Sequence, residues 1–160
     1  MRTAPLLLAI ALSLSYTVWA QQFVPDHTRT FGAIDPGVNQ ENIGDTICVP
    51  GYTNTVRPPS SYTTRLKREQ IHELRLPRTA HDYHEDHLVP LCVGGHPSDP
   101  RDLWPEPVAG QWSASVKDQL EGSVCRAVCK GAMTLQQGRL YFSTSRTGQG
   151  HISSSSALIS

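Results

Sequence analysis

The stretch DYHEDHLVPLCVGGH, residues 82–96, gathers three histidines, three acidic residues and a Gly-Gly pair within fifteen positions. Histidine and carboxylate side chains bind metal ions and transfer protons near neutral pH. The same residue types are common on solvated surfaces, so this stretch alone does not distinguish a chemical site from an exposed loop. The sequence on either side of it is needed to separate the two interpretations.

A β-hairpin is predicted around this stretch. The apolar run 87–93 ends at Gly94-Gly95, and RDLWPEP, residues 101–107, returns after a loop rich in Pro, Ser and Asp. Two such runs separated by turn residues are typical of a hairpin. Asp86 and His87 would then open its first strand.

A helix is predicted on each side of the hairpin in sequence. Residues 113–130 carry apolar side chains at helical spacing and precede Gly131, at a position where helices commonly end. Upstream, the spacing predicts a helix over about 61–75, after two prolines and a serine. A short strand interrupted by a Pro-Gly turn is predicted within TICVPGYTNTV, residues 46–56. These elements together predict an α+β domain.

The ends of the chain differ in composition from this domain. Residues 1–20 have one arginine, an apolar run and small residues at the end, a pattern typical of a secretory signal peptide cleaved after Ala20. Residues 21–45 are predicted to be a flexible arm, and the Ser- and Gly-rich residues 138–160 a disordered tail. The folded domain is therefore expected to span residues 46–137 of an exported, periplasmic or secreted protein, with no membrane attachment after cleavage.

Charge is distributed unevenly although the chain is neutral overall. A local excess of basic residues lies between Arg57 and Arg78, opposed only by Glu69 and Glu73. Such a cluster can attract a polyanion at close range, although it is also typical of an ordinary solvated helix face. The candidate nucleic-acid-binding residues are Arg57, Arg65, Lys67 and Arg68.

The residues around the hairpin resemble the HNH nucleases, the ββα-metal or His-Me finger superfamily. The resemblance is carried by YHEDHLVPLCVGGHPSDPRDLWPEP, with ICVPGYT, VRPPSSYTTRLKR and KDQLE as companion phrases similar to a small exported bacterial group. It covers roughly residues 45–135. It implies a hairpin-plus-helix core with an additional N-terminal helix, and an endonuclease that hydrolyses phosphodiester bonds in nucleic acid, with DNA as the expected substrate and little sequence preference.

The resemblance also implies roles for individual residues. Asp86 becomes a metal ligand and His87 the general base, with a divalent ion, Mg²⁺ before Mn²⁺ or Zn²⁺, acting on the phosphate. Family members supply a second ligand as Asn or His from the following helix; here the candidate is Asp118, with Glu121 and Ser113 as alternatives. The loop-orienting position, usually Asn, is Asp102, which departs from the pattern because a carboxylate cannot donate a hydrogen bond unless protonated.

Four cysteines in an exported chain predict two disulfides, and spacing alone leaves three pairings open. Cys48 and Cys129 match the family's two usual cysteines, so the resemblance implies that they pair. Cys92 and Cys125 would then form a second bridge between hairpin and helix.

Two alternatives to a nuclease remain. One is a catalytically inactive, disulfide-stapled nucleic-acid-binding or scaffold protein of the same fold, which the departures at Asp102 and in the helix favour. The other is a zinc-binding module using His81, His84 and His87, although His81, His84 and His96 are expected to lie at the periphery of the site.

Overall fold

A computed structural model describes residues 25–77, 79–110 and 113–144. The predicted signal peptide, residues 1–20, lies outside the described residues, as does the greater part of the predicted tail, 145–160. Among the described residues, no helix combines the length and the apolar composition needed to cross a membrane.

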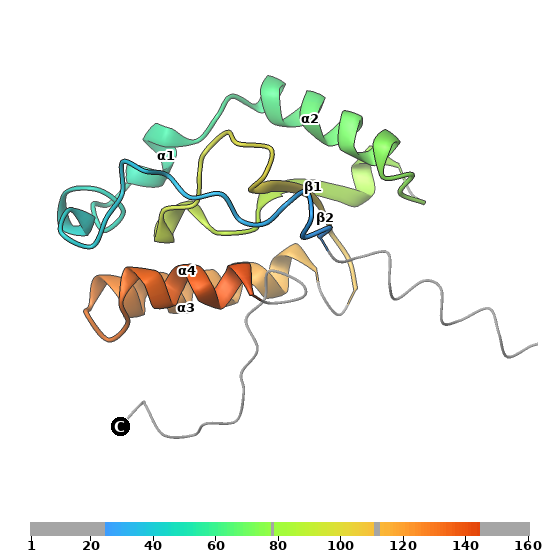
Figure 1. Ribbon diagram of the computed structural model, residues 1–160. Coiled ribbons are helices and arrows are strands. Elements are labelled where there is room, and N and C mark those ends of the chain that lie inside the picture. Colours follow the sequence, from blue (N-terminus) through green and yellow to red (C-terminus); the bar gives the residue numbers. More distant parts are fainter. Residues whose placement is uncertain (1–24, 78, 111–112, 145–160) are drawn as a thin grey trace, which may run out of the picture.

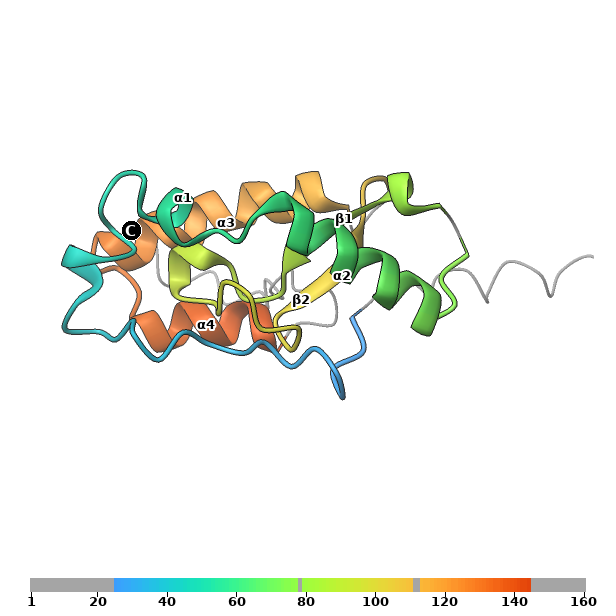
Figure 2. The same ribbon diagram turned by 90° about the horizontal axis from the view of Figure 1, so that it is seen from above.

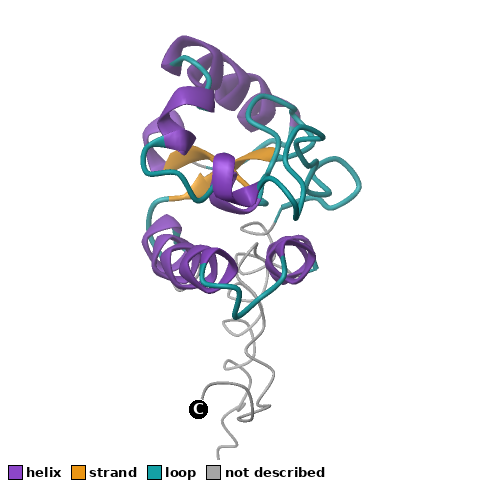
Figure 3. Cartoon of the chain, turned by 90° about the vertical axis from the view of Figure 1, so that its left-hand side faces the viewer, coloured by secondary structure: helices purple, strands orange, loops and turns teal. Residues whose placement is uncertain are grey.

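The described chain is layered around a two-stranded antiparallel sheet (Figures 1 and 3). The strands are β1, Tyr83–His87, and β2, Leu103–Pro107. Helix α2, Ser60–Glu73, covers one face of the sheet, while α3, Ala114–Cys129, and α4, Leu135–Ser143, lie together on the other side. The remaining elements are short: η2 (Ile43–Asp45), α1 (Tyr52–Val56), η3 (Ala80–Asp82) and η4 (Leu91–Val93). The predictions of an α+β domain and of helices near 61–75 and 113–130 are confirmed.

The hairpin is present, but its first strand lies earlier than predicted. His87 ends β1 and pairs with Leu103, while Tyr83 pairs with Pro107. The apolar residues after His87 are not a strand: Pro90 has no N–H to continue a ladder, and the Val89 N–H donates to the Asp102 side chain at 2.8 Å. The run is apolar because it is buried in the core.

A close approach of two backbones explains Gly95 at the end of this run. A Cβ at that position would lie 1.7 Å from the Val89 carbonyl oxygen. Any larger residue would therefore push the 88–93 loop away from the segment that returns toward β2.

The core lies between the 88–93 loop, α3, α4 and the N-terminal segment. Its buried members are mainly aliphatic: Val38, Ile47, Val89, Val93, Val124, Val128, Leu135 and Phe142. Both expected disulfides are present at its border, Cys48–Cys129 and Cys92–Cys125. The first joins the N-terminal segment to the end of α3, and the second joins η4 to α3, so each predicted pairing is confirmed.

Two predictions about the ends of the domain need correction. Residues 25–45 contain little regular structure, yet they pack along the domain: Ile34 forms an isolated bridge with Gly95, and the Arg139 side chain donates to the Val38 carbonyl at 2.8 Å (Figure 2). The tail predicted from residue 138 is helical up to Ser143, within α4. A Cβ at Gly138 would lie 2.9 Å from Val128, so glycine here permits the close packing of α4 against the core.

The predicted strand within residues 46–56 is also wrong. Gly51 adopts a left-handed conformation, φ 85°, at the N-cap of α1, and the residues after it are helical. The Pro-Gly pair therefore starts a helix instead of interrupting a strand.

Candidate active site

Asp86 and His87 are neighbours on β1, and their side chains lie on different sides of the sheet. Because side chains alternate along a strand, Asp86 shares a face with Trp104, its partner on β2, and with Glu106, whereas His87 belongs to the opposite set. The structure places the two predicted residues at one strand end, with separate surroundings.

His87 is held in one tautomer by the loop that follows η4. The ring is 4% exposed, and its Nε2 lies 3.0 Å from the carbonyl oxygen of Pro97. A carbonyl oxygen only accepts hydrogen bonds, so Nε2 must carry the hydrogen. In the neutral ring the lone pair then resides on Nδ1, which is the nitrogen able to take a proton.

The surroundings of His87 keep it neutral at pH 7. Burial lowers its pKa from the ordinary value of 6.5, and the positive charges of Lys117 and Arg57 lower it further. The hydrogen bond to Pro97 and the charge of Asp86 act in the opposite direction without reversing the shift. Arg57, the residue that ends α1, is thus the member of the basic segment whose charge acts on His87.

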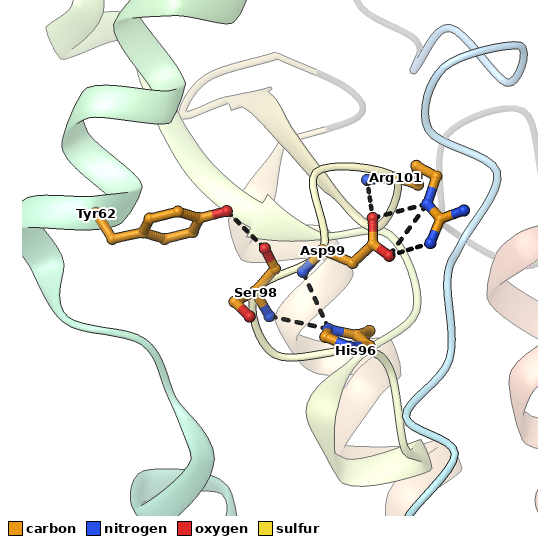
Figure 4. Close-up of polar contacts among 5 residues, drawn as sticks. All are labelled: Tyr62, His96, Ser98, Asp99 and Arg101. Carbon is orange, nitrogen blue, oxygen red and sulfur yellow. Dashed lines mark hydrogen bonds and ion pairs between the residues drawn. The ribbon is translucent and has the colours of Figure 1, made fainter.

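The loop that carries Pro97 is itself braced (Figure 4). His96 Nδ1 accepts from the backbone N–H groups of Ser98 and Asp99, at 3.2 and 3.0 Å. On the other side of Pro97, the Ser98 carbonyl accepts from the hydroxyl of Tyr62 on α2, at 2.5 Å. His96 and Tyr62 therefore fix the residues on either side of the carbonyl that orients His87.

Asp86 is bound by a buried lysine. The Nζ of Lys117 on α3 lies 2.6 Å from Asp86 Oδ2, and the Lys117 side chain is fully buried. The same ammonium is also paired with Glu121, one helical turn further along α3. Burial alone would raise the pKa of Asp86, but the Lys117 charge and hydrogen bonds from Glu106 and Lys117 hold it well below its usual range.

Glu106 completes this charged cluster from β2. It is 0% exposed, and within the described residues neither of its carboxyl oxygens meets a hydrogen-bond donor. Burial, with the neighbouring Asp86, raises its pKa to about 9 against the opposing charge of Lys117. Glu106 therefore holds a proton at pH 7, which it can share with Asp86.

Sequence reasoning missed Lys117 and Glu106 as site residues. A signal for Lys117 was present, because it lies seven residues before Val124 and eleven before Val128, on the buried stripe of α3. A lysine in register with buried valines needs a buried anionic partner. No comparable signal marked Glu106.

The expected divalent-metal site does not fit these residues as they are arranged. Asp118, the predicted second ligand, is exposed on α3, while Lys117 and Glu121 face Asp86. In the part of the chain that the structure describes, no group of three or more His, Cys, Asp or Glu residues is placed to hold a metal ion. The ammonium of Lys117 already binds Asp86 through Oδ2.

Asp102 lies where a loop-orienting residue would act. It is 0% exposed; its Oδ1 accepts the Val89 N–H, whereas Oδ2 has no partner among the described residues. Burial raises the pKa of Asp102 to about 8, opposed by the Val89 hydrogen bond and the Lys117 charge. The side chain thus braces the turn through a single backbone contact.

The other basic residues predicted to bind nucleic acid lie on α2 and do not contact the Asp86–Lys117 pair. Lys67 Nζ donates to the Tyr83 carbonyl at 2.7 Å and so ties α2 to β1. Arg65 and Arg68 are exposed and line a shallow groove along the helix. They provide a basic outer surface and take no part in the cluster around Lys117.

The remaining histidines do not converge on His87. His84 is exposed on β1 and belongs to the opposite set of strand side chains. His81 is exposed on η3, and His96 faces its own loop. This placement gives no support to a zinc module built from His81, His84 and His87.

No family model matches the chain, and no curated protein or solved structure is significantly similar to it. The function therefore has to be argued from the site itself.

Proposed function

We propose that the protein is an exported phosphodiester hydrolase acting on nucleic acid, with the hairpin-plus-helix core of the HNH nucleases and with His87 as general base. The observation that carries this proposal is the fixed tautomer of His87. Its Nε2 is committed to the Pro97 carbonyl, so Nδ1 of a neutral ring can remove a proton from water. The ion pair that joins β1 of the hairpin to α3 supports the resemblance on which the fold is inferred.

The reaction follows from these groups. His87 Nδ1 takes a proton from a water molecule as the oxygen attacks phosphorus, and the bond from phosphorus to the leaving oxygen breaks. Negative charge accumulates on the phosphate and the leaving oxygen. Arg57 is exposed and its charge acts at His87, so it is the residue proposed to bind the phosphate.

In this proposal, α2 binds the backbone phosphates that flank the reacting one. Arg65 and Arg68 are exposed and can contact successive backbone phosphates, which carry no sequence information. This supports cleavage with little sequence preference. Two disulfides support an oxidising, periplasmic or extracellular location.

The test is plasmid nicking by the oxidised protein, in Mg²⁺, in Mn²⁺ and in EDTA. His87→Ala should lower the rate by about 10²–10⁴-fold, whereas His84→Ala, exposed on the same strand, should leave it unchanged. The wild-type rate should fall at low pH with a midpoint below 6.5, since the pKa of His87 is lowered by burial.

Two outcomes would contradict the proposal. Equal losses in His87→Ala and His84→Ala would remove His87 from the chemistry. Wild-type protein that binds DNA but does not cleave it in any of the three solutions would favour the inactive nucleic-acid-binding alternative.

A further inference from the structure

The cluster between the hairpin and α3 has the composition of a cation site. Asp86 and Glu106 project from the same face of the sheet, and Glu121 projects from α3 toward the same ammonium. Two carboxyl groups, those of Asp86 and Glu121, therefore pair with the Nζ of Lys117, and Glu106 lies next to Asp86. Oxygen ligands of this kind are what divalent ions such as Mg²⁺ and Mn²⁺ take in proteins.

Glu106 is the second observation that points to a cation here. It is fully buried, and within the described residues no donor reaches either oxygen. A carboxyl group left without a donor is costly to bury unless it serves a neighbouring charge. The charges that act on it most strongly are those of Lys117 and Asp86.

We propose that Lys117 Nζ is the resident cation between Asp86 and Glu121, with Glu106 beside Asp86, in place of a divalent metal ion. Two consequences follow. The wild-type protein does not bind a divalent ion at this position, and it works without one. Removing the ammonium while keeping the three carboxyl groups leaves a site that takes Mn²⁺. The prediction that the protein without the ammonium takes Mn²⁺ does not depend on the proposed function. The prediction that the wild-type protein works without a divalent ion rests on the proposed function.

Lys117 would act in the reaction as a positioning residue. It is fully buried, so it does not touch the substrate, but it holds the Asp86 carboxylate on the α3 side of the hairpin. Its positive charge also acts on His87 from within the protein. A metal ion bound to Asp86 would supply the same two effects.

The experiment compares Mn²⁺ binding by wild-type protein, Lys117→Met and Lys130→Met, each as the full oxidised chain. Binding is measured by titration calorimetry or by the electron paramagnetic resonance signal of free Mn²⁺. Lys130 is exposed at the end of α3 and serves as the matched control. We expect Lys117→Met to bind one Mn²⁺ at least about tenfold more tightly than wild type or Lys130→Met. Adding Glu106→Gln to Lys117→Met should weaken that binding.

Thermal unfolding gives a second measurement, because Mn²⁺ bound to the folded state raises the melting temperature. MnCl₂ should raise the Tm of Lys117→Met and leave wild type unchanged. If Lys117→Met does not fold, wild-type binding is decisive: no Mn²⁺ bound supports the proposal, and one Mn²⁺ bound per wild-type chain overturns it.

Other results separate this proposal from the proposed function. A folded Lys117→Met that binds no Mn²⁺ would overturn the cation site whatever the activity. Wild-type nicking that survives EDTA supports both proposals, and nicking that EDTA abolishes overturns the metal-free part. Mn²⁺ binding by Lys117→Met in a protein that never nicks DNA would support the cation site and contradict the hydrolase.

Discussion

Asp86 and Asp102 are two aspartates of one hairpin, and they experience opposite electrostatic surroundings. Asp102 is fully buried and Asp86 partly buried, and burial by itself raises the pKa of a carboxyl group. On the α3 side, Lys117 reverses this effect and holds the pKa of Asp86 well below its usual range. On the loop side, the Val89 N–H is the one hydrogen-bond partner that the described chain gives the Asp102 side chain, and burial raises the pKa of that carboxyl to about 8.

The difference shows what each region contributes. The α3 side keeps a carboxylate ionised beside His87 by means of a buried cation. The loop side uses a neutral acid as a spacer that holds the backbone of the 88–93 run. The following predictions test this contrast through variants on either side of the hairpin.

The largest effect is expected from Lys117→Met. It leaves Asp86 and Glu121 next to each other without a cation, and breaking a buried ion pair on one side costs about 3–5 kcal/mol of unfolding free energy. Urea unfolding at pH 7 without added metal measures this loss.

The control neutralises the whole cluster. Asp86→Asn, Lys117→Met and Glu121→Gln together remove the unpaired charges, so the triple variant should recover most of the stability that Lys117→Met loses. A triple variant as unstable as Lys117→Met would mean that the packing of the Lys117 stem, and not its charge, stabilises this side.

Asp102→Asn should have a smaller effect of opposite sign. Its pKa is about 8 in the folded protein against an ordinary 3.8, so its contribution to stability is present below about pH 4 and is lost as pH rises toward 8. An amide needs no proton, and the variant should be more stable than wild type by about 1–3 kcal/mol at pH 7.

The pH dependence provides the check on this prediction. The difference in unfolding free energy between Asp102→Asn and wild type should vanish near pH 3 and grow toward pH 8. An equal difference at both pH values would show that Asp102 acts through hydrogen bonding alone.

The sequence predicted the parts of this fold that obey periodicity. Helices α2 and α3 follow from apolar spacing and their stop signals, and the two disulfides were placed correctly. The sequence pattern does not predict most of β1, because a strand that buries charged side chains shows no alternation of polar and apolar residues. The apolar run 87–93 predicts the strand too late in the chain, since a buried loop with Pro90 is as apolar as a buried strand.

The site was predictable only in its local part. Asp86 and His87 are adjacent in sequence, so a short motif identifies them. Lys117 is brought to Asp86 from 31 positions away, and it was overlooked in favour of its neighbour Asp118. Which face of α3 meets the hairpin depends on long-range packing, and a shift of one residue along a helix exchanges a buried lysine for an exposed aspartate.

The smallest effect is expected from His96→Ala, on the loop side. The variant loses the acceptor for two backbone N–H groups that water can replace, so the cost should be about 1 kcal/mol. Its consequence for His87 should be larger, because Pro97 follows His96 and its carbonyl alone fixes the hydrogen on Nε2. Nitrogen chemical shifts of the His87 ring should show one tautomer in wild type and a mixture in His96→Ala. His96→Asn, which keeps an acceptor, should retain most of the wild-type tautomer. An unchanged tautomer in His96→Ala would mean that the hydrogen bond from Tyr62 on α2 to the Ser98 carbonyl is enough to hold the loop that orients His87.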